Sequence, residues 1–198
     1  MSSPLIVVTG ATGQLGQTIS QLWAESPLPQ YRLKVLSRSA LDIGKAEMTD
    51  AILSELKPSV VVNAAAYTQV DKAESDAAGA ALVNAQGAGA IASWVAANQA
   101  RLIHISTDFV FDGTSKTPYT VNQQTNPLGA YGASKLAGEQ QIQALANGCS
   151  AIVRTSWLYS EHGNNFVKAM LRLMGERDQL SVVNDQVGSP SSTHGLAD

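Results

Sequence analysis

The sequence contains very little cysteine and no excess of charge, and each shortage excludes a class of protein. The single cysteine, Cys149, cannot form a disulfide within the chain, which fits a reducing compartment. Charged residues make up 15% of the chain and the net charge is −3, so the basic face that nucleic acid requires is missing. No apolar run approaches the roughly 20 residues that span a bilayer, and no basic start marks a signal peptide. We therefore expect a cytoplasmic protein that binds neither nucleic acid nor membrane.

The sequence does contain short apolar segments that alternate with helical patterns. These segments are apolar throughout, which is typical of parallel strands covered on both faces. The strands are expected at Leu5–Thr9, Leu33–Ser37, Val60–Asn63, Leu102–Ser106, Ala151–Thr155 and Leu180–Val183. The helices are expected at Gln14–Ala24, Lys45–Leu56, Ala78–Asn98, Gly132–Ala146 and Asn165–Glu176. This order predicts an α/β fold, a Rossmann-like doubly wound parallel sheet of about six strands with helices on both faces.

A glycine turn, "TGATGQLG", lies between the first expected strand and the first expected helix. Gly10 allows a tight turn, Gly13 lets the backbone approach a pyrophosphate, and Gly16 permits close helix–strand packing. The pyrophosphate of a dinucleotide would sit at the positive end of the helix. The alternative is an ordinary turn with packing glycines. The residues predicted to contact the cofactor here are Gly10, Thr12, Gly13, Gln14, Leu15 and Gly16.

The end of the second expected strand indicates which dinucleotide is preferred. An NAD site places a carboxylate there for the ribose 2′-hydroxyl, whereas this sequence has Ser37 and Arg38. A guanidinium pairs with a 2′-phosphate and a hydroxyl can donate to it. We therefore expect a preference for NADPH, with NADH possible. The alternative for Arg38 is a solvated surface charge.

Tyr131 and Lys135 lie four residues apart at the start of a strong helical pattern, so both side chains share one helix face. A lysine ammonium nearby favours the phenolate and is expected to lower the pKa of the tyrosine toward neutrality. Ser106 and Thr107 stand at the carboxyl end of the fourth expected strand, where open α/β sheets bind ligands. A hydroxyl there can donate to a carbonyl oxygen as negative charge develops. Together these residues predict the reduction of a carbonyl group.

These features resemble the extended short-chain dehydrogenase/reductase superfamily and, within it, the dTDP-4-dehydrorhamnose reductase family. The segments that carry the closer resemblance are "VVNAAAYTQVDKAE", "STDFVFDG", "YGASKLAGE", "RTSWLY", "GNNFVKAML" and "VVNDQVGSP". The resemblance implies reduction of the C4 keto group of a dTDP-4-keto-6-deoxy-L-sugar to give dTDP-L-rhamnose. It implies further that Thr107, Tyr131 and Lys135 form the catalytic triad, with Tyr131 protonating the C4 oxygen and Lys135 also holding the nicotinamide ribose.

The resemblance assigns further residues to the two ligands. The additional cofactor positions are Asp42 and Ile43 near the adenine and Ala65, Ala66 and Tyr67 after the third strand. The positions facing the sugar nucleotide are Thr68, Val70, Thr107, Asp108 and Trp157. The resemblance also implies a longer chain. We therefore expect residues 1–187 to form an NAD(P)-binding Rossmann domain and residues 188–198 to start a truncated C-terminal substrate domain.

Two other functions stay open at this point. A sugar-nucleotide dehydratase or epimerase is disfavoured because Asp108 is followed by Phe109 rather than the glutamate that expels water. A non-catalytic NADP-binding regulatory subunit is disfavoured only weakly, since such proteins can keep catalytic residues. The glutamates through which some family members dimerise around a metal have no match here, so no metal site is predicted. The protein is expected to be a monomer or a homodimer.

Overall fold

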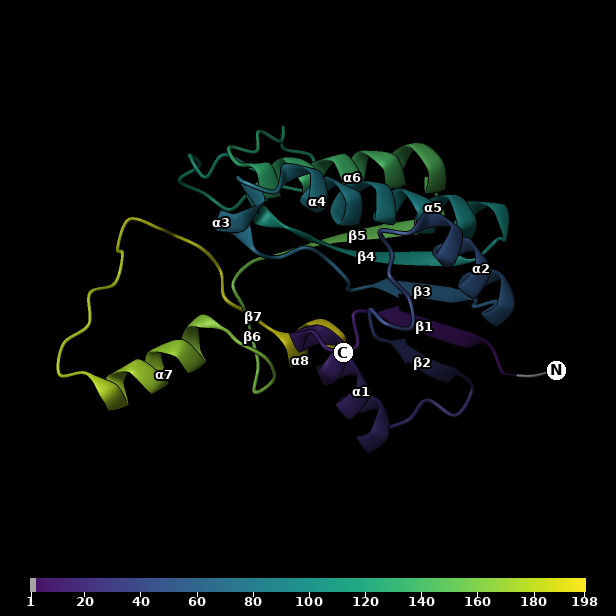
Figure 1. Cartoon of the computed structure of the whole chain (residues 1–198), viewed down its shortest axis with the longest axis horizontal. Helices are drawn as coiled ribbons and strands as arrows, with labels where there is room; N and C mark the ends of the chain where they lie inside the picture. The colour runs from purple at the N-terminus through teal and green to yellow at the C-terminus, as the bar shows by residue number, and fades with distance from the viewer. Residues whose placement is uncertain (1–2) are drawn as a thin grey trace.

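The computed structural model describes residues 3–198 and confirms the doubly wound α/β fold (Figure 1). The strands of its main sheet are β1 (Leu5–Thr9), β2 (Arg32–Leu36), β3 (Val60–Asn63), β4 (Arg101–Thr107) and β5 (Ser150–Thr155). They are parallel and five in number, in the order β2-β1-β3-β4-β5. From β1 the chain adds β2 on one side of the sheet, and it then adds β3, β4 and β5 on the other side. A ligand site is therefore expected at the carboxyl ends of β1 and β3, where the two directions of growth meet.

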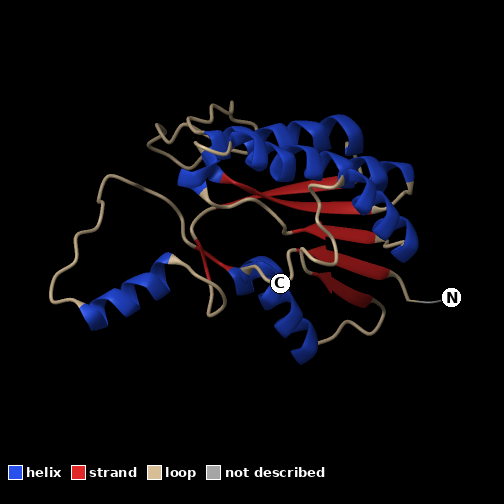
Figure 2. Cartoon of the chain, in the orientation of Figure 1, coloured by secondary structure: helices blue, strands red, loops and turns tan. Residues whose placement is uncertain are grey.

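Helices cover the sheet from two sides (Figures 1 and 2). The layer on one face holds α2 (Ala46–Leu56), α5 (Ala88–Ala97) and α6 (Ala130–Ala146). The layer on the other face holds α1 (Gln14–Glu25) and the short α8 (Thr193–Ala197), which contact each other. The core is densest under the first layer, where Val7, Val61 and Leu102 of the sheet are buried. On the second face Ile103 is 37% exposed, so α1 and α8 cover that face only in part.

The helix expected at Ala78–Asn98 is a continuous helical segment with a change of type in its middle. It consists of α4 (Ala77–Ala81), a π-helical turn η1 (Leu82–Gly87) and α5. By length and composition alone, this Ala77–Ala97 segment of 21 residues could cross a membrane, since an 18-residue window within it has a mean hydropathy of 1.2, but 56% of that window is buried inside the protein. Its residues Ile91 and Val95 are fully buried in the protein core. The segment is accordingly described as a core helix of this fold.

The strand expected at Leu180–Val183 is not formed, so this expectation was wrong. Val182 and Val183 are 51% and 69% exposed, within an irregular stretch that pairs with no neighbouring strand. Two short strands instead form a separate parallel pair, β6 (Leu158–Tyr159) and β7 (Ser191–Ser192). An apolar, β-branched run becomes a strand only when a sheet edge is there to receive its hydrogen bonds.

The segment between β6 and β7 carries α7 (Phe166–Glu176), which projects away from the sheet (Figure 1). Asn165 caps this helix, because its Oδ1 accepts a hydrogen bond from the Lys168 amide at 3.1 Å. None of the residues of α7 is buried. The remaining elements are α3 (Val70–Ala73) and a 3-10 turn η2 (Asp108–Val110).

Candidate active site

The glycine turn is tight at Gly10, as the sequence predicted, but Gly16 plays a different part from the one expected. Gly10 has a φ of +81°, and a Cβ there would lie 2.8 Å from the Ala64 carbonyl oxygen, so only glycine fits without strain. The Gly13 amide donates to the Gly10 carbonyl oxygen at 3.0 Å and closes the turn. A Cβ on Gly16 would collide with the Gly10 carbonyl oxygen, so Gly16 packs on the turn itself rather than on the strand.

The amino end of α1 is open for an anion. Gly13 is its N-cap with an extended backbone, no side chain caps it, and its first turn contains no acidic residue. The first amides of a helix lack partners inside the helix and carry partial positive charge. Leu15 is buried, so only its backbone can face a ligand, whereas Thr12 is exposed. Gln14 Oε1 accepts from Asn165 Nδ2 at 2.9 Å, which ties the turn to the cap of α7.

The predicted adenosine side of the site contains a charged pair. Arg38 Nε lies 3.3 Å from Asp42 Oδ2, and the Arg38 side chain is 80% exposed. Ser37 Oγ lies 2.8 Å from Ser39 Oγ, also at the surface. Arg38 and Ser37 are therefore accessible to a phosphate. The Ile43 side chain is buried, so only its backbone could meet an adenine ring.

The turn after β3 is fixed by a buried asparagine that sequence reasoning missed. Asn84, in η1, accepts from the Tyr67 amide at 2.8 Å and donates to the Tyr67 carbonyl oxygen at 3.0 Å. Its Nδ2 also donates to Ser134 Oγ at 2.9 Å, on the helix that carries Tyr131. Asn84 thus joins the Ala65–Tyr67 turn to α6. A π-helical turn in mid-helix is a common mark of a functional site, but it has no periodic signature in the sequence.

The predicted catalytic residues are brought to the carboxyl end of β4. Thr107 ends β4, and its Oγ1 accepts from the Phe109 amide at 3.2 Å. Tyr131 lies in the first turn of α6, and its ring meets that of Phe109 edge-on with centroids 5.6 Å apart. Asp108 Oδ2 accepts from Ser156 Oγ at 2.7 Å, which draws β5 to the same edge.

The expected lowering of the Tyr131 pKa is not found. Burial raises the pKa of Tyr131 above its usual value, a hydrogen bond with Thr107 opposes this, and the charge of Asp108 raises it further. The reason is geometric, because Lys135 is directed elsewhere. Its Nζ donates to the Ile105 carbonyl oxygen at 2.6 Å and lies 3.2 Å from His104 Nε2.

Lys135 is fully enclosed, although it carries an ionisable group. Its side chain is 2% exposed, and burial lowers its pKa to about 8, with the charge of Glu139 opposing that shift. His104 is a buried core residue with a partner on its other ring nitrogen, since Asn63 Nδ2 lies 3.0 Å from its Nδ1. Because Asn63 also accepts from Thr9 Oγ1 at 2.7 Å, hydrogen bonds run without a break from Lys135 to the strand before Gly10.

A buried ion pair fixes the helix that carries Tyr131 and Lys135. Glu139 is 1% exposed and receives Arg154 Nη2 at 2.6 Å and Ser106 Oγ at 2.5 Å. Arg154 lies over the Phe111 ring, 5.0 Å from its centroid. The pair therefore holds α6, β4, β5 and the loop after β4 in one arrangement. Glu139 could have been suspected only from its place on the inner face of the Tyr–Lys helix, one turn after Lys135.

The residues predicted to face the sugar nucleotide lie around the same edge of the sheet. Thr68 and Val70 follow β3 at the start of α3, which contacts α6. Trp157 follows β5, has a φ of +45° and is 46% exposed. A positive φ is rare for a residue with a bulky side chain. Within residues 3–198, no group of three or more potential ligands could hold a metal ion.

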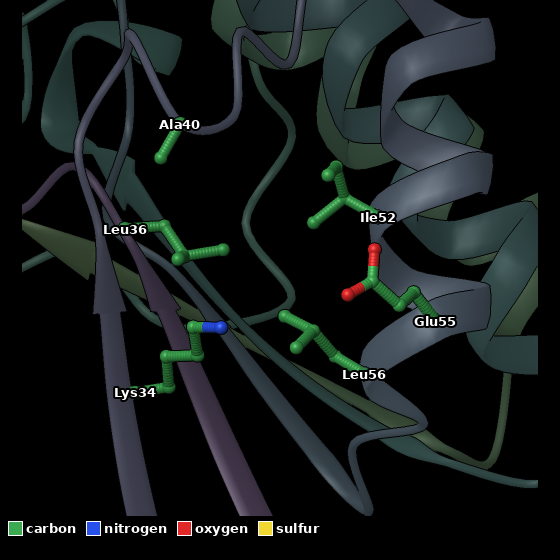
Figure 3. Close-up of a pocket in the computed structure, with 6 residues that line it drawn as sticks. All are labelled: Lys34, Leu36, Ala40, Ile52, Glu55 and Leu56. Atoms are coloured by element: carbon green, nitrogen blue, oxygen red, sulfur yellow. The ribbon is translucent and has the colours of Figure 1, made fainter.

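A small cavity lies elsewhere and contains none of the predicted catalytic residues (Figure 3). Its volume is about 130 Å³, and it opens between β2 and α2. The residues that line it are Lys34, Leu36, Ala40, Ile52, Glu55 and Leu56. The chemistry-bearing residues gather instead at the carboxyl ends of β1, β3 and β4, which is where a doubly wound fold places its ligands.

The parallel sheet, the glycine turn before α1 and the Tyr–Lys helix beside Thr107 define a member of the extended short-chain dehydrogenase/reductase class. The model of the RmlD substrate binding domain family matches residues 4–198. The chain therefore belongs to that family. Its similarity to dTDP-4-dehydrorhamnose reductases agrees with this assignment.

Three similar proteins show how far the likeness extends. The dTDP-4-dehydrorhamnose reductase of Burkholderia thailandensis is 42% identical over 98% of this chain and 63% of its own length. The one from Escherichia coli K12 is 43% identical over 98% of this chain and 64% of its own length. The crystal structure of the Bacillus anthracis dTDP-4-dehydrorhamnose reductase in complex with NADP has a TM-score of 0.92 and 40% identity, covering 99% of this chain and 68% of that one. The chain thus spans 63–64% of the length of these two curated relatives.

Proposed function

We propose that this chain forms the cofactor-binding and catalytic part of a reductase that uses NADPH to reduce the C4 keto group of a dTDP-4-keto-6-deoxy-L-sugar, giving dTDP-L-rhamnose. The observation that supports the proposal is that Thr107 ends β4 and that Lys135, on the helix that carries Tyr131, donates to the Ile105 carbonyl oxygen of the same strand, while the glycine turn follows β1 in the same parallel sheet. The names of the relatives support the substrate class. The boundary at residues 187 and 188, a cytoplasmic location, and the monomeric or dimeric state stay predictions.

The residues fit a bound dinucleotide. Gly10 and Gly16 let the turn fold tightly against the backbone of Ala64 and of Gly10, and the uncapped amino end of α1 offers amide donors to a pyrophosphate. Tyr67 and its neighbours Ala65 and Ala66 would lie along the cofactor, held in place by Asn84. When bound, NADPH supplies the hydride for C4.

The chain's own residues complete the reduction with a proton. The carbonyl carbon receives the hydride, its π electrons pass to oxygen, and Tyr131 Oη donates its proton to that oxygen, so the product is an alcohol and the tyrosine becomes a phenolate. Thr107 Oγ1, which donates to Asp108 Oδ1 at 3.2 Å, would turn its hydrogen to the same oxygen as the negative charge grows there. The phenolate regains its proton from solvent, Lys135 would hold the nicotinamide ribose, and Asp108 and Trp157 would hold the sugar nucleotide.

Cofactor choice is proposed to depend on Arg38. The Arg38 side chain is 80% exposed, and Asp42 competes with a 2′-phosphate for its guanidinium. The contribution of Arg38 to NADPH binding is therefore at the lower end for a charge-assisted hydrogen bond, about 1.5 kcal/mol or roughly tenfold in affinity. Arg38→Ala should weaken NADPH binding by about that factor and leave NADH unchanged. Arg101→Ala, at the opposite end of the sheet, is the matched control. Equal NADPH affinity in the wild type and Arg38→Ala would refute this assignment.

The activity is tested in a chimera in which the C-terminal part of the Burkholderia thailandensis relative follows Asp198. Loss of NADPH absorbance should require the dTDP-4-keto-6-deoxy-L-sugar, and Tyr131→Phe should lower kcat by about 10²–10⁴-fold. Tyr31→Phe removes the same hydroxyl far from the site and should change nothing. A chimera that binds NADPH without oxidising it, or a Tyr131→Phe variant with normal turnover, would contradict the reductase mechanism.

A further inference from the structure

The buried imidazole of His104 is faced by a nitrogen group on each side. Asn63 Nδ2 lies 3.0 Å from its Nδ1, and Lys135 Nζ lies 3.2 Å from its Nε2. His104 is 1% exposed, and burial, assisted by the charge of Lys135, holds its pKa well below 6.5. The ring is therefore neutral, with one N–H and one lone pair, and its two nitrogens must play different roles.

The charge on Lys135 decides which nitrogen carries the hydrogen. An ammonium has only donors, so His104 Nε2 must accept from it, Nδ1 must carry the hydrogen, and Asn63 must turn its amide oxygen toward Nδ1. An uncharged amine can instead accept from Nε2–H, and Asn63 then donates to Nδ1 while its Oδ1 accepts from Thr9 Oγ1, as at the observed 2.7 Å. Leaving a buried ammonium opposite an N–H costs more free energy than turning an amide group. The protonation state of Lys135 therefore sets the tautomer of the His104 ring.

We propose that His104 is a positioning residue that orients Lys135 Nζ and changes its ring tautomer, with a turn of the Asn63 amide, each time Lys135 gains or loses its proton. When Lys135 loses its proton as the pH rises, it ends as a neutral amine and the ring hydrogen lies on Nε2 instead of Nδ1, so one proton passes to the solvent in total. The role of His104 in positioning Lys135 rests on the proposed reduction, in which Lys135 acts. The tautomer change is independent of that function. Because the Ala65 amide donates to Thr9 Oγ1 at 3.2 Å, the change reaches the turns on both sides of the predicted cofactor.

The other ionisable groups around Lys135 come from α6 and β5 and set the pH window. Glu139 follows one turn later on α6 and raises the pKa of Lys135, but it is neutralised by Arg154 from β5. Tyr131 precedes by one turn and is uncharged below its raised pKa. Burial is the larger effect and brings the pKa of Lys135 to about 8. Below pH 8 the Nδ1–H tautomer is expected, and above it the Nε2–H tautomer.

The direct test is long-range ¹H–¹⁵N spectroscopy of the 198-residue chain labelled with ¹⁵N-histidine, recorded from pH 6.5 to 9.5. His104→Gln identifies the signals of His104, and the more exposed His162 and His194 serve as internal references. We expect the two ring nitrogens of His104 to exchange their chemical shifts with a midpoint near pH 8, while the ring stays neutral. One unchanged tautomer across this range, or a ring that is protonated at pH 6.5, would overturn the proposal.

A second variant removes the titrating group and leaves the histidine in place. Lys135→Met has a side chain of similar length without a charge, so His104 should stay as the Nε2–H tautomer at every pH. A tautomer change that persists in Lys135→Met would refute the coupling, even if His104→Gln failed to fold. Neither spectrum depends on turnover, so an inactive chimera would reject the reductase function without deciding this proposal.

Turnover supplies a readout that a purely structural role would not move. In the chimera, Gln at position 104 can keep its amide oxygen toward Lys135 and so favour the ammonium. We expect His104→Gln to raise the alkaline midpoint of kcat/KM by about one pH unit, because a fixed acceptor stabilises the charged lysine. His194→Gln should leave the midpoint unchanged. A uniform loss of activity at every pH, with no shift of the midpoint, would show that His104 acts only in packing.

Discussion

The ion pair between Glu139 and Arg154 gives a sharp prediction about stability. Glu139 is 1% exposed and Arg154 is 22% exposed, and Glu139→Ala removes the contacts to Arg154 Nη2 at 2.6 Å and to Ser106 Oγ at 2.5 Å. Breaking a buried pair on one side costs about 3–5 kcal/mol, since the remaining charge is left without a partner. Arg154 recovers part of its hydration, so we expect about 3 kcal/mol, at the lower end of that range.

The measurement is the free energy of unfolding in urea at pH 7. A loss of about 3 kcal/mol corresponds to roughly 6–12 °C in Tm for a chain of this length. Glu176→Ala is the matched control, because Glu176 pairs with Arg172 at 2.9 Å on the exposed surface of α7. We expect that variant to lose no more than about 0.5 kcal/mol. Similar losses for the two variants would refute the argument that burial, rather than the number of contacts, makes the first pair important.

Two further predictions concern the glycine turn and the buried lysine. Gly16→Ala should destabilise the fold by about 2 kcal/mol or more and abolish NADPH binding, since its Cβ collides with backbone. The control is Gly175→Ala in α7, whose Cβ meets nothing within 4 Å and which should gain about 0.5–1 kcal/mol of stability. Calorimetry measures the stability of both variants, and cofactor titration measures their NADPH binding. For Lys135, the folded pKa of about 8 lies below the ordinary 10.5, so the unfolded chain binds more protons between these values and the wild type gains stability as pH rises through this window. The free energy of unfolding of the wild type, measured relative to Lys135→Met, should therefore rise by about 3 kcal/mol between pH 7 and 10.5. A difference between the two proteins that is constant with pH would contradict the lowered pKa of Lys135.

The parts of the fold that could be predicted are those encoded in local sequence. The strand at Leu5–Thr9 matched to the residue, and the helix with Tyr131 began close to where its pattern starts, because hydrophobic runs and glycine punctuation are local signals. The positive φ of Gly10 follows from the same logic. Strand ends then indicated which side chains meet, because all parallel strands end at one edge of the sheet.

The missed features depend on tertiary partners. The run Leu180–Val183 has strand composition, yet no edge receives it, so composition alone gave the wrong result. The raised pKa of Tyr131 could not be predicted, because it comes first from burial in the folded protein, and because Lys135, which was expected to lower it, is directed toward His104, 31 residues away in sequence. Asn84 has no pattern of its own, and its role is visible only once η1 packs beside Tyr67.

The separation of α7 from the sheet has a consequence for how the chain opens. Because none of its residues is buried, melting α7 exposes little new apolar surface, and it should behave as a unit of low local stability whose amide hydrogens exchange while those of α6 stay protected. Its cap, Asn165, is bonded to Gln14 beside the glycine turn. A dinucleotide that immobilises Gln14 would slow amide exchange throughout α7, so deuterium uptake in α7 would report on occupancy of the cofactor site. Uptake that is unchanged by saturating NADPH would show that α7 and the glycine turn are not coupled.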